Sequence, residues 1–324
     1  MKRINLVFVV GILTIFSACK KSGGTGNTGG DGNGSGTGPK PTEENYKPNT
    51  TVYGSNKYVT FKVGDANSPI ILASPHDGEL TPTSMPLRDH PDAVTVRDLY
   101  LTDLVEEISN ALYAKTGIRP HVIINDVARS RMEPNRSLNE TYHKSEAANA
   151  LWREYHAFLK GARDMVQQNV GKGLFLDMHG HGHTKQRVEV GYIVSRTNLN
   201  ATDAVLNGVS ATSSIYHLSR NSAYSFSQLI RGDYAFGTLL ANEGLPAVPS
   251  KQDPKPEQDD YFNGGYCTLT YGSRDGGTVS AIQLETNGSN LRNNPTQRKA
   301  SGAKIADAII KYMKNHYALY PNVN

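Results

Sequence analysis

The chain has 324 residues, a formal net charge of +4 and only two cysteines. Its positive charge is weak and dispersed, which argues against a nucleic-acid-binding protein, because such proteins concentrate basic residues in a patch or stripe. The cysteine count excludes a disulfide framework and a cysteine-rich metal site.

The first 18 residues have the composition of an export signal. Lys2 and Arg3 precede the apolar run INLVFVVGILTIF, which is shorter than the roughly 18 residues of a membrane-spanning helix. Cys19 follows at the position of the acylated cysteine of a bacterial lipoprotein. We therefore predict a signal peptide over 1–18 and a protein held at the bacterial cell envelope, with lipidated Cys19 as its membrane contact. A plain cleaved signal with an incidental cysteine is the alternative.

A flexible tether is predicted to separate this lipid anchor from the folded part. Residues 20–40 are mostly Gly, Ser, Thr and Asn, with nothing to bury in a core. We predict the tether over 19–49 and one α/β domain over 50–324, since the length suits one core and no second linker interrupts it.

Strand and helix patterns alternate along the predicted domain. Alternating or continuously β-branched runs indicate strands, and apolar residues at helical spacing indicate helices. In chain order we predict strands over 57–63 and 69–74, a helix over 96–117, a strand over 121–126, a helix over 143–169, strands over 173–180 and 188–194, a helix over 225–244, a strand over 278–285 and a helix over 296–317. This order predicts a mostly parallel sheet covered by helices on both faces. The segment 197–225 gives no firm element.

Polar segments follow four of the predicted strands at their C-terminal ends. These segments are SPHDGE, NDVARSRMEPNR, DMHGHGH and QLETN. Ligands of parallel α/β sheets collect outside the carboxyl ends of the strands. We therefore expect the four segments to line one crevice, which is the convergence that a catalytic site needs.

A metal site is the first chemistry that these segments indicate. His76 and Glu79 have the spacing H-x-x-E, and His179 can supply a third ligand from a neighbouring strand. Two histidines and a glutamate leave a fourth position for water, a pattern typical of catalytic zinc. We predict one zinc ion per chain, bound by His76, Glu79 and His179. Taken singly, the H-x-x-E pair also fits a surface contact, and the histidine-rich segment also fits an exposed loop.

Other polar residues of the same segment are expected around the metal. His181 and His183 would overfill a tetrahedral site, so we expect them to line the pocket, with His181 contacting substrate. Asp177 either accepts a hydrogen bond from a ligand or lies in a structural hydrogen bond.

With these residues in hand, the chain resembles the N-formylglutamate amidohydrolase family and, more distantly, the zinc carboxypeptidases and aspartoacylases. The segment YFNGGYCTLTYGSRDGGTVSAIQLETN (261–287) is similar to the family's succession F-x-G-G-Y, Y-G and A-x-Q-L-E. The order of SPHDGE, RSRMEPNR and DMHGHG agrees, and the resemblance extends over most of residues 70–290. It implies a three-layer α/β sandwich of the phosphorylase/hydrolase-like, zinc-peptidase-like type, with a mostly parallel mixed sheet.

The resemblance also implies roles for residues outside the metal site. It makes Glu285 the general base and Arg129 the group that polarises the scissile carbonyl. Asn135 and Arg136 match the family's N-R pair, which clamps a substrate carboxylate. On residue type alone, Glu285 also fits a buried salt-bridge partner, and the arginines also fit a solvated basic loop.

Together these features predict a zinc-dependent amidohydrolase that cleaves an amide bond in a small substrate with a free carboxylate. One alternative is an envelope zinc peptidase of carboxypeptidase type, which would tolerate a longer acyl side. Another is a non-catalytic lipoprotein that binds a metal or another ligand and saturates without hydrolysis. The presence of Glu285 favours an enzyme, because binding alone needs no base.

Overall fold

A computed structural model describes residues 46–320 and 323. The predicted signal peptide, Cys19 and most of the tether lie outside the described residues. Tyr46 is buried against Phe61 and Phe158, so the fold includes residues that we had assigned to the tether. Within the described part of the chain, no helix has both the length and the apolar composition needed to cross a bilayer.

A mixed sheet of eight strands runs through the described residues. Its strands are β1 Thr51–Tyr53, β2 Val59–Lys62, β3 Ile70–Ser74, β4 His121–Asn125, β5 Gly173–His181, β6 Val188–Gly191, β7 Ala247–Val248 and β8 Val279–Asn287. The spatial order is β1-β2-β4-β3-β5-β8-β6-β7. The four central strands β4, β3, β5 and β8 are parallel. β2 runs antiparallel to β1 and β4, and β6 runs antiparallel to β8 but parallel to β7. The carboxyl ends of the central strands therefore share one edge of the sheet.

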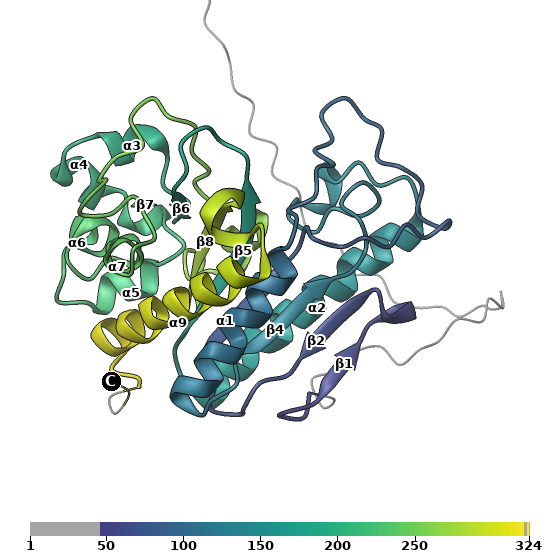
Figure 1. Cartoon of the computed structure of the whole chain (residues 1–324), viewed down its shortest axis with the longest axis horizontal. Helices are drawn as coiled ribbons and strands as arrows, with labels where there is room; N and C mark the ends of the chain where they lie inside the picture. Colours follow the sequence, from purple (N-terminus) through teal and green to yellow (C-terminus); the bar gives the residue numbers. More distant parts are fainter. Residues whose placement is uncertain (1–45, 321–322, 324) are drawn as a thin grey trace, which may run out of the picture. The chain divides into compact units, whose positions relative to one another are not determined.

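Helices cover both faces of this sheet. They are α1 Leu101–Thr116, α2 Glu146–Asn169, α3 Arg196–Asn200, α4 Asp203–Gly208, α5 Tyr216–Asn221, α6 Phe226–Arg231, α7 Phe236–Asn242, α8 Tyr266–Tyr271 and α9 Pro295–Tyr317, with short turns at Ser55–Lys57, Leu138–Glu140, Ser210–Thr212 and Gly288–Arg292. α1 and α9 lie side by side over one face, and the short helices α3 to α7 gather near β6 and β7 (Figure 1). α2 and α8 pack on the other face. The predicted three-layer α/β fold with a mixed sheet is confirmed.

Two helix predictions differ from the structure for local reasons. α1 begins at Leu101 rather than 96, because the Asp77 carboxylate accepts the backbone N–H groups of Tyr100 and Thr102 and holds the chain ahead of the helix. The predicted helix over 225–244 is two helices, α6 and α7, because the backbone at Gly232 is extended. The segment 197–225, which gave no firm element, contains α3, α4 and α5.

The face of the sheet toward α2 changes character along the strands. On β5 it begins with Phe175 in the core and continues with Asp177 and His179. On β8 it begins with Ala281 and continues with Gln283 and Glu285. Alternate residues of a strand share one face, so the apolar residues that fix the strands in the core also fix the polar residues beyond them. The site residues thus lie on the same face of β5 and β8 as the core residues, nearer the carboxyl ends of the strands.

Candidate metal centre and active site

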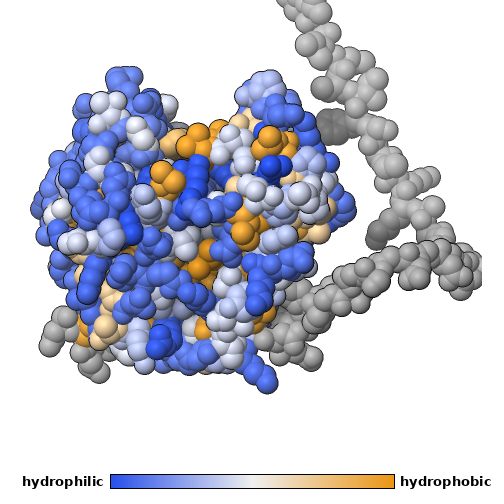
Figure 2. Space-filling model, turned by 45° about the vertical axis from the view of Figure 1, so that its right-hand side comes forward, coloured by the Kyte–Doolittle hydropathy of each residue, from blue (hydrophilic) through white to orange (hydrophobic). Residues whose placement is uncertain are grey.

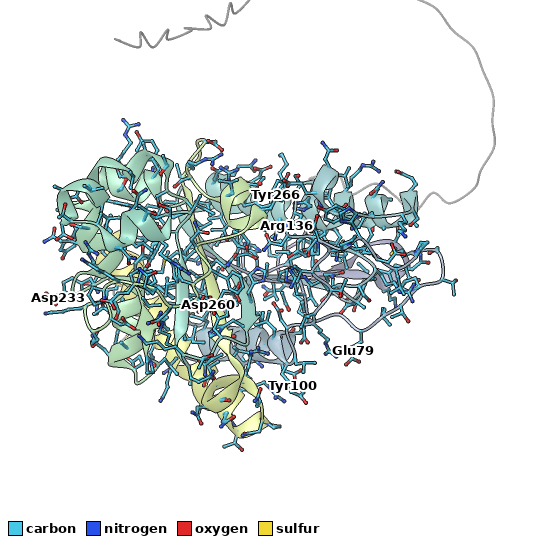
Figure 3. All side chains as sticks on the ribbon, turned by 90° about the horizontal axis from the view of Figure 1, so that it is seen from above. Glu79, Tyr100, Arg136, Asp233, Asp260 and Tyr266 are labelled. Atoms are coloured by element: carbon cyan, nitrogen blue, oxygen red, sulfur yellow. The ribbon has the colours of Figure 1, made fainter. Side chains whose placement is uncertain are left out.

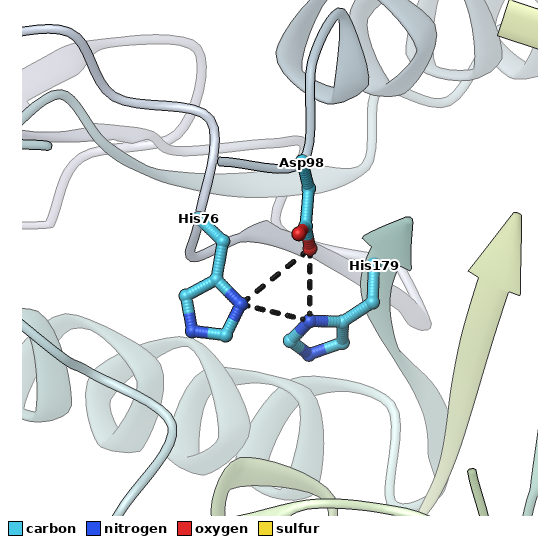
Figure 4. Close-up of side chains that lie close together, drawn as sticks. All are labelled: His76, Asp98 and His179. Carbon is cyan, nitrogen blue, oxygen red and sulfur yellow. Dashed lines mark hydrogen bonds and ion pairs between the residues drawn. The ribbon is translucent and has the colours of Figure 1, made fainter. Parts of the chain in front are cut away.

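Two histidines and an aspartate meet at the carboxyl edge of the sheet (Figure 4). His76 follows β3, His179 lies on β5, and Asp98 precedes α1. The Nδ1 atoms of the two histidines are 3.2 Å apart. The Asp98 Oδ2 atom lies 3.5 Å from Nδ1 of His76 and 3.4 Å from Nδ1 of His179. All three side chains are buried.

The far nitrogen of each imidazole is held by a carboxylate. Nε2 of His76 lies 2.6 Å from Oε1 of Glu133, and Nε2 of His179 lies 3.1 Å from Oδ1 of Asp177. A carboxylate only accepts hydrogen bonds, so we assign the proton of each ring to Nε2 and a lone pair to Nδ1. Three acceptor atoms then face one another, and a cation bound between them would offset their mutual repulsion. Of the two roles expected for Asp177, the structure supports the one that orients a ligand.

The geometry of the three acceptors fits a metal ion. Metal–nitrogen and metal–oxygen bonds of about 2.0 to 2.1 Å in a tetrahedral site place neighbouring ligand atoms about 3.3 Å apart. The three separations here, 3.2, 3.4 and 3.5 Å, match one face of such a tetrahedron. Three protein ligands leave the fourth position for water or substrate, as catalytic rather than structural sites do.

The surrounding charges favour a positive ion at this point. Burial alone would raise the pKa of Asp98, but hydrogen bonds from the protonated forms of His179 and His76, and their positive charge, hold that pKa well below its usual value. Burial alone would lower the pKa of His179, yet the Asp177 carboxylate raises it well above the ordinary value. The pKa of buried Glu133 is likewise held low by His76 and Arg129. These pKa shifts keep Asp98 and Glu133 negatively charged and favour positive charge on His179, as expected at a site that attracts a cation.

The predicted third ligand, Glu79, does not join the cluster. Residues 76–80 run alongside the chain after β4, where Leu80 forms a parallel bridge with Val127. In such an extended segment, residues three apart point to opposite sides. The side chain of Glu79 is 72% exposed and pairs with Arg97, and it is well separated from Arg136 in Figure 3. The H-x-x-E spacing was therefore misinterpreted, since it requires a tight turn that the chain does not make.

Asp98 takes the place that we assigned to Glu79. It lay within the helix predicted over 96–117, so we did not consider it as a ligand. Its backbone N–H donates to the carbonyl of His76, and its Oδ2 accepts the N–H of Gly180. In the sequence, Asp98 is distinguished only as an acidic residue three positions before Leu101, where the apolar helical pattern begins. Its proximity to His76 and His179 depends on tertiary contacts.

Glu285 lies beside the metal centre on β8, opposite His179 in register on β5. Burial raises its pKa to about 8, which the charge of His179 opposes and the carboxylates of Asp98 and Glu189 reinforce. Its Oε1 accepts a hydrogen bond from Gln283, while Oε2 is buried without a partner among the described residues. A buried carboxylate with a raised pKa and a free oxygen is suited to accept a proton and pass it on.

A cleft of about 170 Å³ opens over these residues. The predicted arginines Arg129 and Arg136 both line it. Arg129 donates to Glu133 at 2.9 Å, and one of its terminal nitrogens lies 3.9 Å from Asp98. Arg136 is exposed in the cleft, and its backbone carbonyl accepts the indole N–H of Trp152. Both guanidinium groups therefore border the space in which a substrate would bind.

Asn135, which we paired with Arg136 as a substrate clamp, lines the cleft and also has structural partners. Its Oδ1 accepts the backbone N–H of Cys267 at 2.8 Å, and its Nδ2 lies 3.0 Å from Nε2 of His179. The contact with Cys267 fixes the start of α8, whereas the amide nitrogen of Asn135 cannot donate to Nε2 of His179 while that nitrogen carries the proton. Both residues line the cleft, and Arg136 is the more exposed of the two.

His181 does not line the cleft as expected. It is buried in a second cluster with His183 and Glu189, a residue of β6. Nε2 of His181 donates to the carbonyl of Arg187, and its Nδ1 accepts the N–H of His183. The Glu189 carboxylate accepts from Nδ1 of His183 at 2.7 Å and from the N–H of Phe262 at 2.7 Å. Nδ1 of His181 and both oxygens of Glu189 thus each face a donor.

Neither a protein-family model nor a curated protein matches the chain. Among solved structures, it is similar to the N-formylglutamate amidohydrolase of Ralstonia eutropha JMP134, with a TM-score of 0.43, 12% identity and coverage of 82% of this chain and 99% of that one. It is also similar to the N-acetylmuramyl-L-alanine amidase of Mycobacterium smegmatis, with a TM-score of 0.32, 14% identity and coverage of 75% and 96%. The argument for function rests on the site itself.

Proposed function

We propose that this protein is a zinc-dependent amidohydrolase that cleaves an amide bond in a small substrate with a free carboxylate. The observation that carries the proposal is the convergence of His76, Asp98 and His179 as three buried acceptors. Two imidazoles and a carboxylate are the donor set of catalytic zinc sites. The buried base Glu285 stands directly beside them.

His76, Asp98 and His179 would hold the zinc ion. When bound, zinc would act as a Lewis acid toward the scissile carbonyl and make hydroxide available near neutral pH. Glu285 removes a proton from the attacking water through its free Oε2 and then delivers it to the leaving nitrogen. Burial makes Glu285 a stronger base than an ordinary glutamate, which suits the first transfer, and its protonated form can then give the proton to the leaving nitrogen.

The two cleft arginines supply the positive charge that an amide substrate needs. Arg129 is fixed by Glu133 beside Asp98 and would stabilise the developing oxyanion. Arg136 is exposed and would pair with the substrate carboxylate, through two parallel hydrogen bonds if both oxygens are engaged. Hydrolysis near a free carboxylate is the reaction class that this arrangement serves.

The first test is the metal content of the purified protein by elemental analysis after zinc is supplied. We expect one zinc ion per chain, its loss in Asp98→Ala and in His76→Ala, and its retention in the matched control Glu79→Ala. The wild-type protein should then hydrolyse N-acyl amino acids. No metal in the wild-type protein would overturn the proposal. Metal without hydrolysis of any N-acyl amino acid or short peptide would favour a binding protein.

We also propose that the protein is held at the bacterial cell envelope through lipidated Cys19. The support is the order of a charged start, a short apolar run and Cys19 in the sequence. Replacement Cys19→Ser should move the protein from the membrane fraction of cells to a fraction without membranes. An unchanged distribution would contradict this location.

A further inference from the structure

An exposed phenylalanine lies at the mouth of the cleft. Phe262 precedes α8 and lines the same space as His76, Asp98 and Glu285, yet 46% of its surface is exposed. Large aromatic side chains are usually buried on folding, since that removes apolar surface from water. An aromatic ring left in water beside a polar site can gain this free energy when a ligand covers it.

The ring of Phe262 is held in place by the second histidine cluster. Its backbone N–H donates to Glu189 at 2.7 Å, and its ring stacks on His183 with centroids 4.7 Å apart. The same Glu189 fixes His183 through Nδ1. The next residue accepts the backbone N–H of Ile193 at 2.7 Å. The backbone and the ring of Phe262 are thus both held in place, so ligand binding should cost little conformational entropy at this residue.

A second exposed apolar residue, Val94, lines the cleft. It lies in the segment before α1, and 45% of its surface is exposed. Nearby in sequence, Val96 and Leu99 are exposed as well. Apolar surface stands out on the otherwise hydrophilic face drawn in Figure 2. The cleft therefore combines a polar floor, where the chemistry lies, with apolar side chains at its border.

We propose that Phe262 and Val94 bind an apolar group next to the scissile amide, so that the preferred substrates are N-acyl amino acids with an apolar side chain or acyl group. This inference rests on the proposed amidohydrolase function and specifies its substrate class. Phe262 determines the preference by direct contact. His183 and Glu189 act as positioning residues, because they touch the ring and its backbone rather than the substrate.

The test compares pairs of substrates that differ in one side chain or in one acyl group. The first pair is N-acetylphenylalanine and N-acetylglutamate, and the second is N-hexanoylglycine and N-acetylglycine. We expect kcat/KM of the wild-type zinc-loaded protein to favour the apolar member of at least one pair, and Phe262→Ala to lower that preference about tenfold, a change of about 1.4 kcal/mol. Phe262→Tyr should retain most of it. The control Tyr53→Ala removes an equally exposed aromatic ring from β1 and should leave the preference unchanged.

Positioning by His183 gives a separate signature. His183→Ala should lower the apolar preference less than Phe262→Ala, mainly through KM, and His183→Phe should restore it because the stacking partner returns. If Phe262→Ala changes both members of each pair equally, or if the wild-type protein favours neither apolar member, the inference is wrong and the amidohydrolase function stands.

Failure of the proposed function is distinguished by binding. Calorimetric titration of Glu285→Gln and of Glu285→Gln with Phe262→Ala by the same compounds measures the preference without turnover. If wild-type protein hydrolyses nothing, a tenfold loss of the affinity ratio in the double variant still supports the apolar contact. An unchanged ratio would overturn it.

Discussion

Two clusters of histidine and carboxylate lie near the carboxyl edge of the sheet, yet the atoms at their centres are bonded differently. In the cluster of His76, Asp98 and His179, each imidazole donates outward to a carboxylate and turns its lone pair inward. In the cluster of His181, His183 and Glu189, the donors and acceptors satisfy one another. The first is therefore organised to receive a cation, and the second is a closed network that fixes a loop.

The comparison shows that the bonding of the inner imidazole nitrogen decides whether a histidine cluster can hold a cation. Glu133 and Asp177 lock the tautomers of the first cluster and leave three acceptors facing one another. Nε2 of His181 likewise donates outward, to the carbonyl of Arg187, but its Nδ1 already accepts the N–H of His183. Residue type and spacing within HGHGH do not distinguish these two situations.

The largest contrast is expected from removing one histidine of each cluster. His179→Ala should abolish stoichiometric zinc binding, because two of the three converging ligands remain. His183→Ala should keep one ion per chain, since its partners need no metal. Elemental analysis of both proteins checks this. Two ions per wild-type chain, with one lost in His183→Ala, would contradict the distinction between the clusters.

Next in size is the contrast between two glutamates that pair across β8 and β6. Glu285→Gln should lower kcat by about 10² to 10⁴-fold while zinc stays bound, because the proton acceptor is lost. Glu189→Gln should lower kcat/KM by no more than about tenfold, through the position of Phe262, because its contacts support that loop. Steady-state kinetics of the two variants measures the difference. Comparable losses of kcat would mean that Glu285 is not the base.

A smaller effect is expected from the carboxylate behind a metal ligand. Glu133→Gln should weaken zinc binding about 10 to 100-fold, since the charge that orients His76 and raises its basicity is removed. Competition with a chromophoric chelator gives the affinity. Glu140→Gln changes an exposed glutamate of the same loop and is the matched control. Equal affinities for the two variants would remove Glu133 from the site.

The smallest effect is expected for His121, which lies outside both clusters and shows what burial without a carboxylate cluster does to a histidine. Burial lowers the pKa of His121 to about 4, whereas an unfolded histidine has a pKa near 6.5. Protonation therefore favours the unfolded chain, and the stabilising contribution is present above pH 6.5 and lost as the pH falls toward 4. At pH 5 the loss is about 2 kcal/mol.

Urea unfolding at pH 7 and pH 5 measures this loss of unfolding free energy. The variant His121→Asn keeps an acceptor for the N–H of Gly64 but has no group that titrates in this range. Its free energy of unfolding should fall less between the two pH values than that of the wild-type protein, by about 2 kcal/mol. Equal losses would mean that His121 does not contribute to the acid sensitivity.

The sequence by itself determined the α/β class, the strands that end in polar segments, and the residues His76, His179, Arg129, Arg136 and Glu285 that meet at one edge of the sheet. Strand patterns are local, and the carboxyl ends of parallel strands must coincide, so these predictions follow from the chain itself. Residues at the end of a strand are positioned by the core residues that precede them on the same strand.

Only the tertiary structure decided the third ligand and the tasks of Asn135 and His181. Asp98 replaces Glu79 because Asp77 and Arg97 hold the chain before α1 against the segment after β3, which is a contact between segments about 20 residues apart. Asn135 holds the start of α8 while it lines the cleft, and His181 is drawn into a separate cluster by its hydrogen bonds with Arg187 and His183. Spacing in the sequence describes local geometry, whereas the direction of a hydrogen bond depends on partners that only folding brings near.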